Sequence, residues 1–345
     1  MNPHAASAPL LVTMGDPAGV GPEIIVGAVM AHPGLLDDIV VAGDVATLNR
    51  AARVMASSTH MKVPDIVAVS GPDDRPGAGV LAVWQACETH EPVTWGRADP
   101  VAGRAAVQCI EAGAGAVLEN RARALVTAPV HKEALAMAGV PFPGHTEMLQ
   151  ALAAKHMGCT VKELPVRMML SEPRLRTVLV SIHVALADAI AMVTQAQVLQ
   201  TIEITHRHFQ LTGMQRPRIA VAGLNPHAGE GGLFGREEIL AIAPAVEQAR
   251  KSGIDVTGPY PPDTVFMQAR KGAFDVVIAM YHDQGLIAVK LLGIEHGVNT
   301  TLGLPFVRTS PDHGTAFDLA GQGVASPDSL LAAIEAARSA ASAPA

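Results

Sequence analysis

The chain has 345 residues, a formal net charge of −7, and 49% hydrophobic but only 3% aromatic residues. This composition excludes a disordered chain, and the scattered lysines and arginines argue against a nucleic-acid groove or an anionic membrane surface. The apolar positions are filled mainly by Ala, Val, Leu, Ile and Met, a usage typical of helices packed on a parallel sheet. We therefore expect an α/β protein that binds a small polar partner, with no nucleic acid and no membrane.

Short apolar runs recur between helical patterns, and each is followed by a segment with Gly, Pro, Asn or His. They predict strands at Leu10–Met14, Ile39–Ala42, Ala124–Thr127, Arg176–Ile182, Arg218–Ala222 and Val276–Met280. Helical spacing covers Ala185–Phe209 and Gly235–Ser252, and Gly253 is a predicted stop for the second helix. The alternation is typical of βα units, in which functional loops follow the carboxyl ends of strands.

A glycine-rich loop follows the first predicted strand, with Gly15, Asp16 and Gly19 ahead of a helix that has Pro22 in its first turn. Glycines let a ligand approach the backbone closely, and the free N–H groups of a helix start favour an anion. The loop lacks G-x-G-x-x-G spacing, so it is not the usual dinucleotide fingerprint. The pattern alone leaves a structural turn and a ligand-binding loop equally open.

Three histidines each come at the end of a predicted strand: His183, His227 and His282. Parallel strands can deliver three imidazoles to one crevice, and imidazole is a common ligand of zinc and other divalent ions. The pattern indicates a shared metal site, although each histidine by itself is more often a packed or hydrogen-bonded residue. Asp283 either orients the His282 imidazole or faces solvent.

A further set of polar side chains suits a bound oxyanion, because charge-assisted donors recognise carboxylates and phosphates. The set consists of His145, Thr146, Lys290, Asn299 and Arg308. Taken singly, each is equally a surface residue or a helix cap, and Thr146 is a candidate cap for the helix that runs to Lys155.

The segment Asp312–Gly323 is punctuated by glycines. A carboxylate such as Asp318 beside a glycine-lined pocket suits a ribose diol and repels a 2′-phosphate. The pattern alone favours an ordinary helix-capping loop.

Together these segments resemble the 4-hydroxythreonine-4-phosphate dehydrogenase family of pyridoxal phosphate biosynthesis, over nearly the whole chain. The resemblance is carried by TMGDPAGVGPEI, TAPVHKEAL, GHTEML, LNPHAGEGG, MYHDQGL, GVNTTLGLPFVRTSPDHGTA and DLAGQG. It implies a fold like that of isocitrate and isopropylmalate dehydrogenases, with two α/β subdomains and an active-site cleft between them and at a homodimer interface. The expected cofactor-side subdomain is 1–135 plus 285–345, and the expected metal, substrate and dimerisation subdomain is 136–284.

The resemblance also implies the reaction. It is a metal-dependent, NAD-linked oxidation with decarboxylation, best matched to 4-phosphooxy-L-threonine giving 3-amino-2-oxopropyl phosphate, with NADP as a possible cofactor. One divalent ion, Zn, Mg, Co or Mn, is implied on the three histidines, with ligands from both subunits.

The residues implied to bind the substrate are His145, Thr146, Lys290, Asn299 and Arg308, and Lys290 and Asp283 are the candidates for catalysis. The residues implied to bind the cofactor are Gly15, Asp16, Gly19, His313, Gly314 and Asp318.

The chain departs from the family in two places near the predicted metal. Val184, Ala185 and Leu186 follow His183 where the biosynthetic enzymes tend to read H-L-P-L, and Leu233 stands where a polar residue is common. The substrate therefore stays open, with D-erythronate or D-threonate 4-phosphate and a cis-dihydrodiol dicarboxylate as alternatives. A non-catalytic metal- or metabolite-binding protein and a transferase on a related fold are the other readings.

The three cysteines are far apart and form no C-x-x-C pair, and the sequence shows no secretion signal. Both features predict a cytoplasmic protein.

Overall fold

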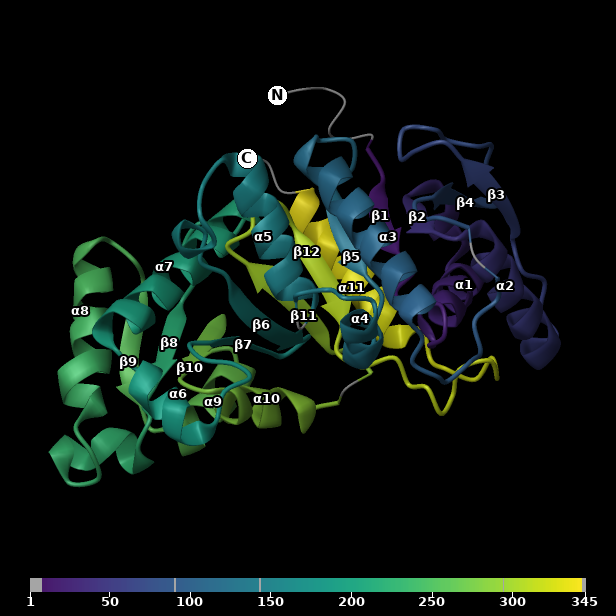
Figure 1. The fold of residues 1–345 in the computed structure, drawn as a ribbon. Coiled ribbons are helices and arrows are strands. Elements are labelled where there is room, and N and C mark those ends of the chain that lie inside the picture. The colour runs from purple at the N-terminus through teal and green to yellow at the C-terminus, as the bar shows by residue number, and fades with distance from the viewer. Residues whose placement is uncertain (1–7, 90, 143, 294, 343–345) are drawn as a thin grey trace. The chain divides into compact units, whose positions relative to one another are not determined.

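The computed structural model describes residues 8–342 except 90, 143 and 294. The chain divides into two compact units (Figure 1). The first unit ends at Pro165 and resumes over Leu304–Ala341, and the second spans Val166–Gly303. Each unit combines a β-sheet with helices, so the predicted α/β class is confirmed.

The sheet of the first unit is parallel in every strand pair, and its described strands run in the order β3-β4-β2-β1-β5-β12. Its strands are β1 (Leu10–Thr13), β2 (Ile39–Gly43), β3 (Asp65–Val69), β4 (Val80–Gln85), β5 (Ala124–Thr127) and β12 (Arg308–Pro311). Its helices are α1 (Gly21–Ala31), α2 (Val45–Thr59), α3 (Pro100–Leu118), α4 (Lys132–Met137), α5 (His145–Met157) and α11 (Asp328–Ala341). Strands β1 and β5 contact both α3 and α11 and are buried along their whole length, as expected for a parallel sheet covered by helices.

The sheet of the second unit has the order β11-β6-β7-β10-β8-β9. Strand β6 is antiparallel to both of its neighbours, whereas β7, β10, β8 and β9 are parallel. Its strands are β6 (Arg167–Glu172), β7 (Leu175–Leu179), β8 (Ile219–Ala222), β9 (Val256–Tyr260), β10 (Val276–Ala279) and β11 (Val298–Leu302). Its helices are α6 (Leu186–Met192), α7 (Gln195–Leu211), α8 (Ala243–Lys251), α9 (Pro262–Arg270) and α10 (His282–Lys290).

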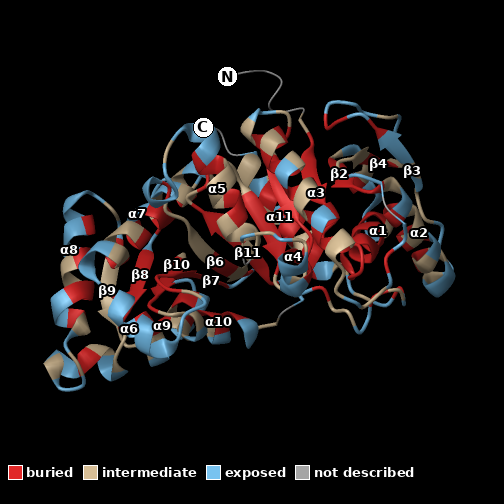
Figure 2. Cartoon of the chain, viewed as in Figure 1, coloured by how far each residue is buried: buried red, intermediate tan, exposed pale blue. Residues whose placement is uncertain are grey.

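Alternate residues of these central strands pack into two different cores. Val178, Val221 and Ile278 belong to the core that includes residues of α7 and α8. Leu179 and Val277 belong to the core that includes residues of α9 and α10. Because side chains alternate along a strand, both faces of β7, β8 and β10 are buried, as the red strands of Figure 2 illustrate. This double burial fixes the positions at which the strands end and their loops begin.

The six predicted strands correspond to β1, β2, β5, β7, β8 and β10. The single predicted helix over Ala185–Phe209 is wrong in detail, because Val193 and Thr194 separate α6 from α7. Thr194 begins the second helix by accepting a hydrogen bond from the Gln197 backbone N–H. Gly253 follows α8 with a φ of 86°, as its predicted role as a stop requires.

The proposed capping role of Thr146 is wrong. Gly144 is the N-cap of α5, and the helix begins at His145. Thr146 therefore lies inside the first turn, where backbone N–H groups have no partner within the helix.

Among the described residues, no helix combines the length and the apolar character needed to cross a membrane.

Candidate active site

The three predicted metal-binding histidines follow three adjacent strands of the second unit. His183 lies beyond the end of β7, His227 lies in the turn Pro226–Gly232 after β8, and His282 is the first residue of α10 after β10. Since these strands are parallel and neighbouring, their carboxyl ends lie at the same edge of the sheet.

Two of the three imidazoles lie close together. The ring centroids of His183 and His282 are 5.6 Å apart at an interplanar angle of 44°, whereas the His227 ring contacts Phe234 with centroids 6.2 Å apart. In the described part of the chain, no group of three or more His, Cys, Asp or Glu side chains is placed to hold a metal ion. One chain therefore offers two neighbouring imidazole donors, a chemically suitable but incomplete ligand set.

Two of these histidines adopt left-handed backbone conformations. His183 has a φ of 44° and His227 a φ of 52°. Such conformations are unfavourable for residues other than glycine and persist only where the surroundings impose them. Near His227 the constraint is Glu238, which is 3% exposed and whose Oε1 accepts the backbone N–H groups of Leu224 and Asn225 at 2.8 and 2.7 Å.

Side-chain hydrogen bonds also tie the three strand ends together. Gln284 accepts the Met280 N–H at 2.7 Å and donates to the Gly223 carbonyl at 2.8 Å, which joins the ends of β10 and β8. The Ser181 hydroxyl donates to the Met280 carbonyl at 3.0 Å, which joins the ends of β7 and β10. Sequence reasoning did not identify Gln284, Ser181 or Glu238 as positioning residues. The only signal was the place of Gln284 two residues after His282.

Asp283 points to the neighbouring imidazole. Its Oδ1 lies 2.7 Å from Nδ1 of His282, although 70% of its side chain is exposed. A carboxylate at this nitrogen leaves Nε2 of His282 as the ring nitrogen available to a metal ion.

The first unit carries a separate, buried cationic site. Arg308 at the start of β12 is 3% exposed, and its Nε and a terminal nitrogen donate to the Thr127 hydroxyl at 3.2 and 2.6 Å. Burial lowers the pKa of Arg308 to about 10, which still leaves the guanidinium charged at neutral pH.

His145 complements this buried charge as a neutral donor or acceptor. Burial, with a smaller effect from Arg308, holds the pKa of His145 well below its usual value. Its Nε2 is buried without a hydrogen-bond partner among the described residues. His145 and Thr146 occupy the first turn of α5, where no side chain caps the backbone N–H groups. Arg308, His145 and this helix start together suit an oxyanion.

The other two candidates for substrate binding lie in the second unit. Lys290 is the exposed last residue of α10, and Asn299 lies in β11. The Asn299 Oδ1 is buried and has no partner within the described part of the chain. The predicted substrate set is thus divided, with three members in one unit and two in the other.

The glycine-rich loop after β1 is closely packed. Gly15 has a φ of 73°, and a Cβ there would lie 2.4 Å from the Pro129 carbonyl oxygen, so this position requires glycine. A Cβ on Gly19 would lie 2.9 Å from Thr315, whose carbonyl accepts the Val20 N–H. The predicted loop therefore contacts the segment that also contains His313 and Asp318.

Asp16 brings a buried carboxyl to this loop. It is 1% exposed, its Oδ1 accepts the Ala18 N–H at 2.8 Å, and its Oδ2 has no partner among the described residues. Burial raises its pKa to about 6. His131 contributes a second buried, unpartnered atom, Nδ1, while its ring stacks on Phe317 with centroids 4.3 Å apart. A ligand with both donor and acceptor groups would satisfy these atoms.

The segment predicted to bind adenosine is held by Glu23, which sequence reasoning did not single out. Glu23 is fully buried in α1, and its two oxygens accept the backbone N–H groups of Gly321 and Gly323 at 2.6 and 2.7 Å. A Cβ on Gly321 would lie 2.5 Å from the Trp95 ring. The segment is thus a fixed, non-helical loop.

The three predicted cofactor residues of this loop differ in exposure, because the Nε2 of His313 is buried and has no hydrogen-bond partner among the described residues. Asp318 and Gly314 are exposed, and the Nδ1 of His313 lies 2.9 Å from the Gly314 carbonyl oxygen.

Comparisons with known proteins show the family of the chain. A family model described as pyridoxal phosphate biosynthetic protein PdxA matches residues 35–337. A 4-hydroxythreonine-4-phosphate dehydrogenase of Beijerinckia indica is 50% identical over 328 residues, 95% of this chain and 93% of that protein. A D-threonate 4-phosphate dehydrogenase of Cupriavidus necator is 44% identical over 327 residues, 94% of each chain.

A solved structure gives the same result. The crystal structure of 4-hydroxythreonine-4-phosphate dehydrogenase from Klebsiella pneumoniae is 41% identical and covers 97% of this chain and 100% of its own, with a TM-score of 0.84. The family resemblance read from the sequence motifs is therefore confirmed, and the chain belongs to the PdxA family of pyridoxal phosphate biosynthetic proteins.

Proposed function

We propose that the protein is an NAD-linked, metal-dependent dehydrogenase of a phosphorylated hydroxy acid. The first candidate substrate is 4-phosphooxy-L-threonine, oxidised and decarboxylated to 3-amino-2-oxopropyl phosphate. The observation that carries the proposal is the buried Arg308 next to a neutral His145 at the uncapped start of α5. The proposal also rests on the names of the relatives, which are dehydrogenases of phosphorylated four-carbon acids.

The phosphate of the substrate is the proposed ligand of Arg308, His145 and Thr146. Arg308 has a fixed orientation because Thr127 holds two of its nitrogens, so little side-chain entropy is lost when an anion binds. The neutral His145 adds no second positive charge beside the guanidinium. Because its ring already bonds to the Ala128 backbone, its unpartnered Nε2 can accept a hydrogen bond from a hydroxyl group of the substrate. Lys290 and Asn299 are the proposed partners of the remaining polar groups of the substrate.

The proposed metal ligands are His183, His227 and His282. A divalent ion supplies Lewis acidity that lowers the pKa of an alcohol, and NAD supplies the hydride acceptor. Asp283 holds the His282 ring by its Nδ1, and Gln284 fixes the backbone on either side.

A homodimer is the proposed source of the missing metal ligand. Exposed apolar side chains flank the histidine loops of the second unit, and exposed apolar groups of this kind favour a protein partner. They are Val184, Leu186, Ile190, Leu233, Phe234, Ile239 and Leu240, each between 44% and 73% exposed. Because two imidazoles, and no group of three metal-binding side chains, come together among the residues that the structure describes, a second copy would complete the set.

The proposed cofactor contacts are Gly15, Asp16 and Gly19 in the first loop and His313, Gly314 and Asp318 in the second. Replacing Asp318 with a small neutral residue should relax a preference for NAD over NADP, because a carboxylate repels the 2′-phosphate. An unchanged ratio of kcat/KM for the two cofactors would remove Asp318 from the cofactor site.

D-Threonate or D-erythronate 4-phosphate is the second candidate substrate. A 44% identical relative is named for D-threonate 4-phosphate, and Val184, Ala185, Leu186 and Leu233 are the positions that depart from the biosynthetic pattern.

Nicotinamide reduction tests these proposals directly. The purified chain, supplied with Mg²⁺, Mn²⁺, Co²⁺ or Zn²⁺ and NAD, should reduce the cofactor with one of the phosphorylated acids. A comparison of 4-phosphooxy-L-threonine, both sugar-acid phosphates and a cis-dihydrodiol dicarboxylate would identify the substrate. No reduction with any of them would overturn the assignment as a dehydrogenase of this class.

A further inference from the structure

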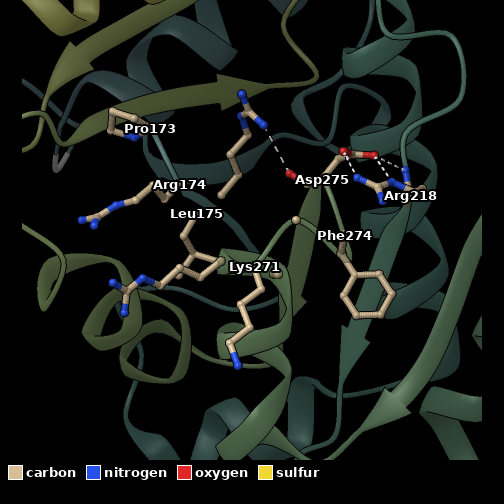
Figure 3. A pocket seen from close by; sticks show the side chains of 11 residues that line it. Pro173, Arg174, Leu175, Arg218, Lys271, Phe274 and Asp275 are labelled. Carbon is tan, nitrogen blue, oxygen red and sulfur yellow. Dashed lines mark hydrogen bonds and ion pairs between the residues drawn. The ribbon is translucent and has the colours of Figure 1, made fainter.

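A cavity of about 370 Å³ lies in the second unit, and none of the residues assigned above lines it. It is formed by the turn between β6 and β7, by the residue before β8, by the end of α9, and by the residues that lead into β10 (Figure 3). Its lining residues are Pro173, Arg174, Leu175, Arg176, Arg218, Ala269, Arg270, Lys271, Gly272, Phe274 and Asp275.

This cavity is strongly basic although the chain is acidic. Five of its lining side chains are Arg or Lys and only one is a carboxylate, whereas the whole chain carries a net charge of −7. Its lining also includes apolar residues, since Leu175 and Ala269 are buried and the Phe274 ring packs against Tyr260 with centroids 5.2 Å apart. A basic cavity with a smaller apolar part suits an anion with a small organic body.

Part of this positive charge is fixed in place. Arg218 forms a two-pronged pair with Asp275 at 2.8 and 3.1 Å, as the dashed lines in Figure 3 show. Arg176 donates to the Asp275 carbonyl at 3.4 Å, and its guanidinium lies 5.9 Å from the centre of the Phe209 ring. Arg174 contacts the Glu172 carboxylate at 3.3 Å and the Leu292 carbonyl at 3.1 Å. These contacts hold the three arginines in place in the lining of the cavity, and they neutralise only part of its positive charge.

The remaining two cations are available. Arg270 and Lys271 are exposed at the end of α9, and their head groups make no hydrogen bond or ion pair with any residue that the structure describes. The helix dipole favours basic residues at the C-terminal end of a helix, which explains why Arg270 and Lys271 occur at the end of α9. It does not account for Arg174, Arg176 and Arg218, which come from other elements.

The cavity and the histidines occupy opposite ends of the same strands. Arg176 and Arg218 lie at the amino ends of β7 and β8, whereas His183 and His227 follow their carboxyl ends. Strand β7 runs from Leu175 to Leu179 and His183 follows four residues later, so the strand alone separates Arg176 from the start of the His183 loop by about 10 Å. An occupant of the cavity therefore does not contact the proposed metal site.

We propose that this cavity is a second anion site that binds a small, free phosphorylated metabolite carrying at least two negative charges. Arg270 and Lys271 supply the mobile contacts, and Arg174, Arg176 and Arg218 supply the fixed positive surface. Guanidinium groups recognise phosphate oxygens in pairs, and each charge-assisted contact strengthens binding more than a neutral one does.

Pyrophosphate is the probe for the test, with binding measured by isothermal titration calorimetry on the full chain. The wild type should bind pyrophosphate at two sites, this cavity and the proposed substrate site at Arg308. R270A/K271A should lose one site or weaken it at least tenfold, because two charge-assisted contacts are removed. The KM for the phosphorylated substrate should not change in this variant, since both side chains are exposed and neither is among the proposed substrate-binding residues.

The chain supplies a matched control. Arg250 and Lys251 are a basic pair at the corresponding place in the last turn of α8 and are also exposed, with Lys251 3.3 Å from the Glu247 carboxylate, but they line no part of the cavity. R250A/K251A should retain both sites with affinities within twofold of the wild type. If R270A/K271A binds pyrophosphate as the wild type does, the site does not exist. If both variants weaken binding equally, the interaction is diffuse attraction, and the proposal is also overturned.

Discussion

The two units hold their candidate site groups in different ways. In the first unit Asp16, Glu23 and Arg308 are buried charged or ionisable groups, fixed by hydrogen bonds inside one chain. In the second unit the side chains of His183 and His227 are exposed, and both residues have a left-handed backbone conformation. The hydrogen bonds described above hold the loops of these two histidines rather than their imidazole rings. The first arrangement is preorganised for a charged ligand, whereas the second brings two imidazoles together within the described chain, and we propose that further donors complete it.

The largest effect is expected at the proposed metal-binding histidines of the second unit. His227→Ala should reduce metal-dependent turnover by at least about a thousandfold, as removal of a principal catalytic group does in other enzymes, while the fold persists. Activity is to be measured with each divalent metal and after chelation, together with circular dichroism. Full activity in a chelated sample would remove the metal from the mechanism.

His60 provides the control for backbone strain. It is an exposed histidine at the end of α2 with a φ of 56°, close to the value at His227. His60→Ala should therefore change stability by a similar amount and leave turnover unchanged. Equal losses of turnover in the two variants would mean that strain, and not metal binding, explains the effect.

The next largest effect is expected at the buried cation. Arg308→Met should lower kcat/KM for the phosphorylated substrate by about 100-fold or more, because a charge-assisted pair contributes roughly 3 kcal/mol. The dephosphorylated substrate should be affected much less. Arg308→Lys keeps the charge but not the two-pronged geometry, so it should recover only part of the loss. Equal losses with both substrates would assign Arg308 a structural role.

Two buried carboxylates allow a direct comparison of the units. Glu23 accepts two backbone N–H groups from the Gly321 loop, and Glu238 accepts two from the His227 loop. Glu23→Ala should raise the KM for NAD about tenfold and leave metal affinity unchanged, whereas Glu238→Ala should do the reverse. Each substitution leaves two backbone N–H groups without their acceptor, so each should also lower the free energy of unfolding by about 2–4 kcal/mol.

Metal titration and cofactor kinetics on both variants provide the measurement. If both variants changed cofactor KM and metal affinity together, the loops would not be held independently, and the contrast between the units would fail.

The sequence predicted the parts of the fold whose signals are local. The apolar, β-branched run at Ala124–Thr127 coincides with β5 because the strand is buried on both faces. Strand β12, Arg308–Pro311, contains Arg, Thr, Ser and Pro and has no such signal. It is a strand because it pairs with β5, a tertiary contact that no local pattern contains.

The same distinction applies to the candidate site. The histidines were recognised by their places after predicted strands, which is a local property. The hydrogen bond from the Gly321 backbone to Glu23 joins residues 298 positions apart, so only the folded structure could reveal it. The neutral state of His145 likewise results from burial beside Arg308, which depends on how β5, α5 and β12 pack.

The smallest expected effect concerns this neutral imidazole. Because the folded-state pKa of His145 lies below that of the unfolded chain, its stabilising contribution is complete above pH 6.5 and is lost as the pH falls. Below pH 6.5 the unfolding free energy should fall by up to about 1.4 kcal/mol per pH unit through this group. Urea unfolding at pH 7.5, 6.5 and 5.5 measures the slope, which His145→Gln should reduce.

The His145→Gln variant is needed as a reference because the pKa of Asp16 is also shifted and changes the stability with pH. That pKa, raised to about 6, gives a contribution that is present below pH 3.8 and is lost as the pH rises through about 6, which opposes the His145 slope. The difference between wild type and His145→Gln cancels the Asp16 contribution, since both proteins contain it. His227→Ala removes an exposed imidazole from the other unit and is the control, for which no change of slope is expected. An equal reduction by both histidine substitutions would contradict the contrast between a buried, preorganised site and an exposed, incomplete one.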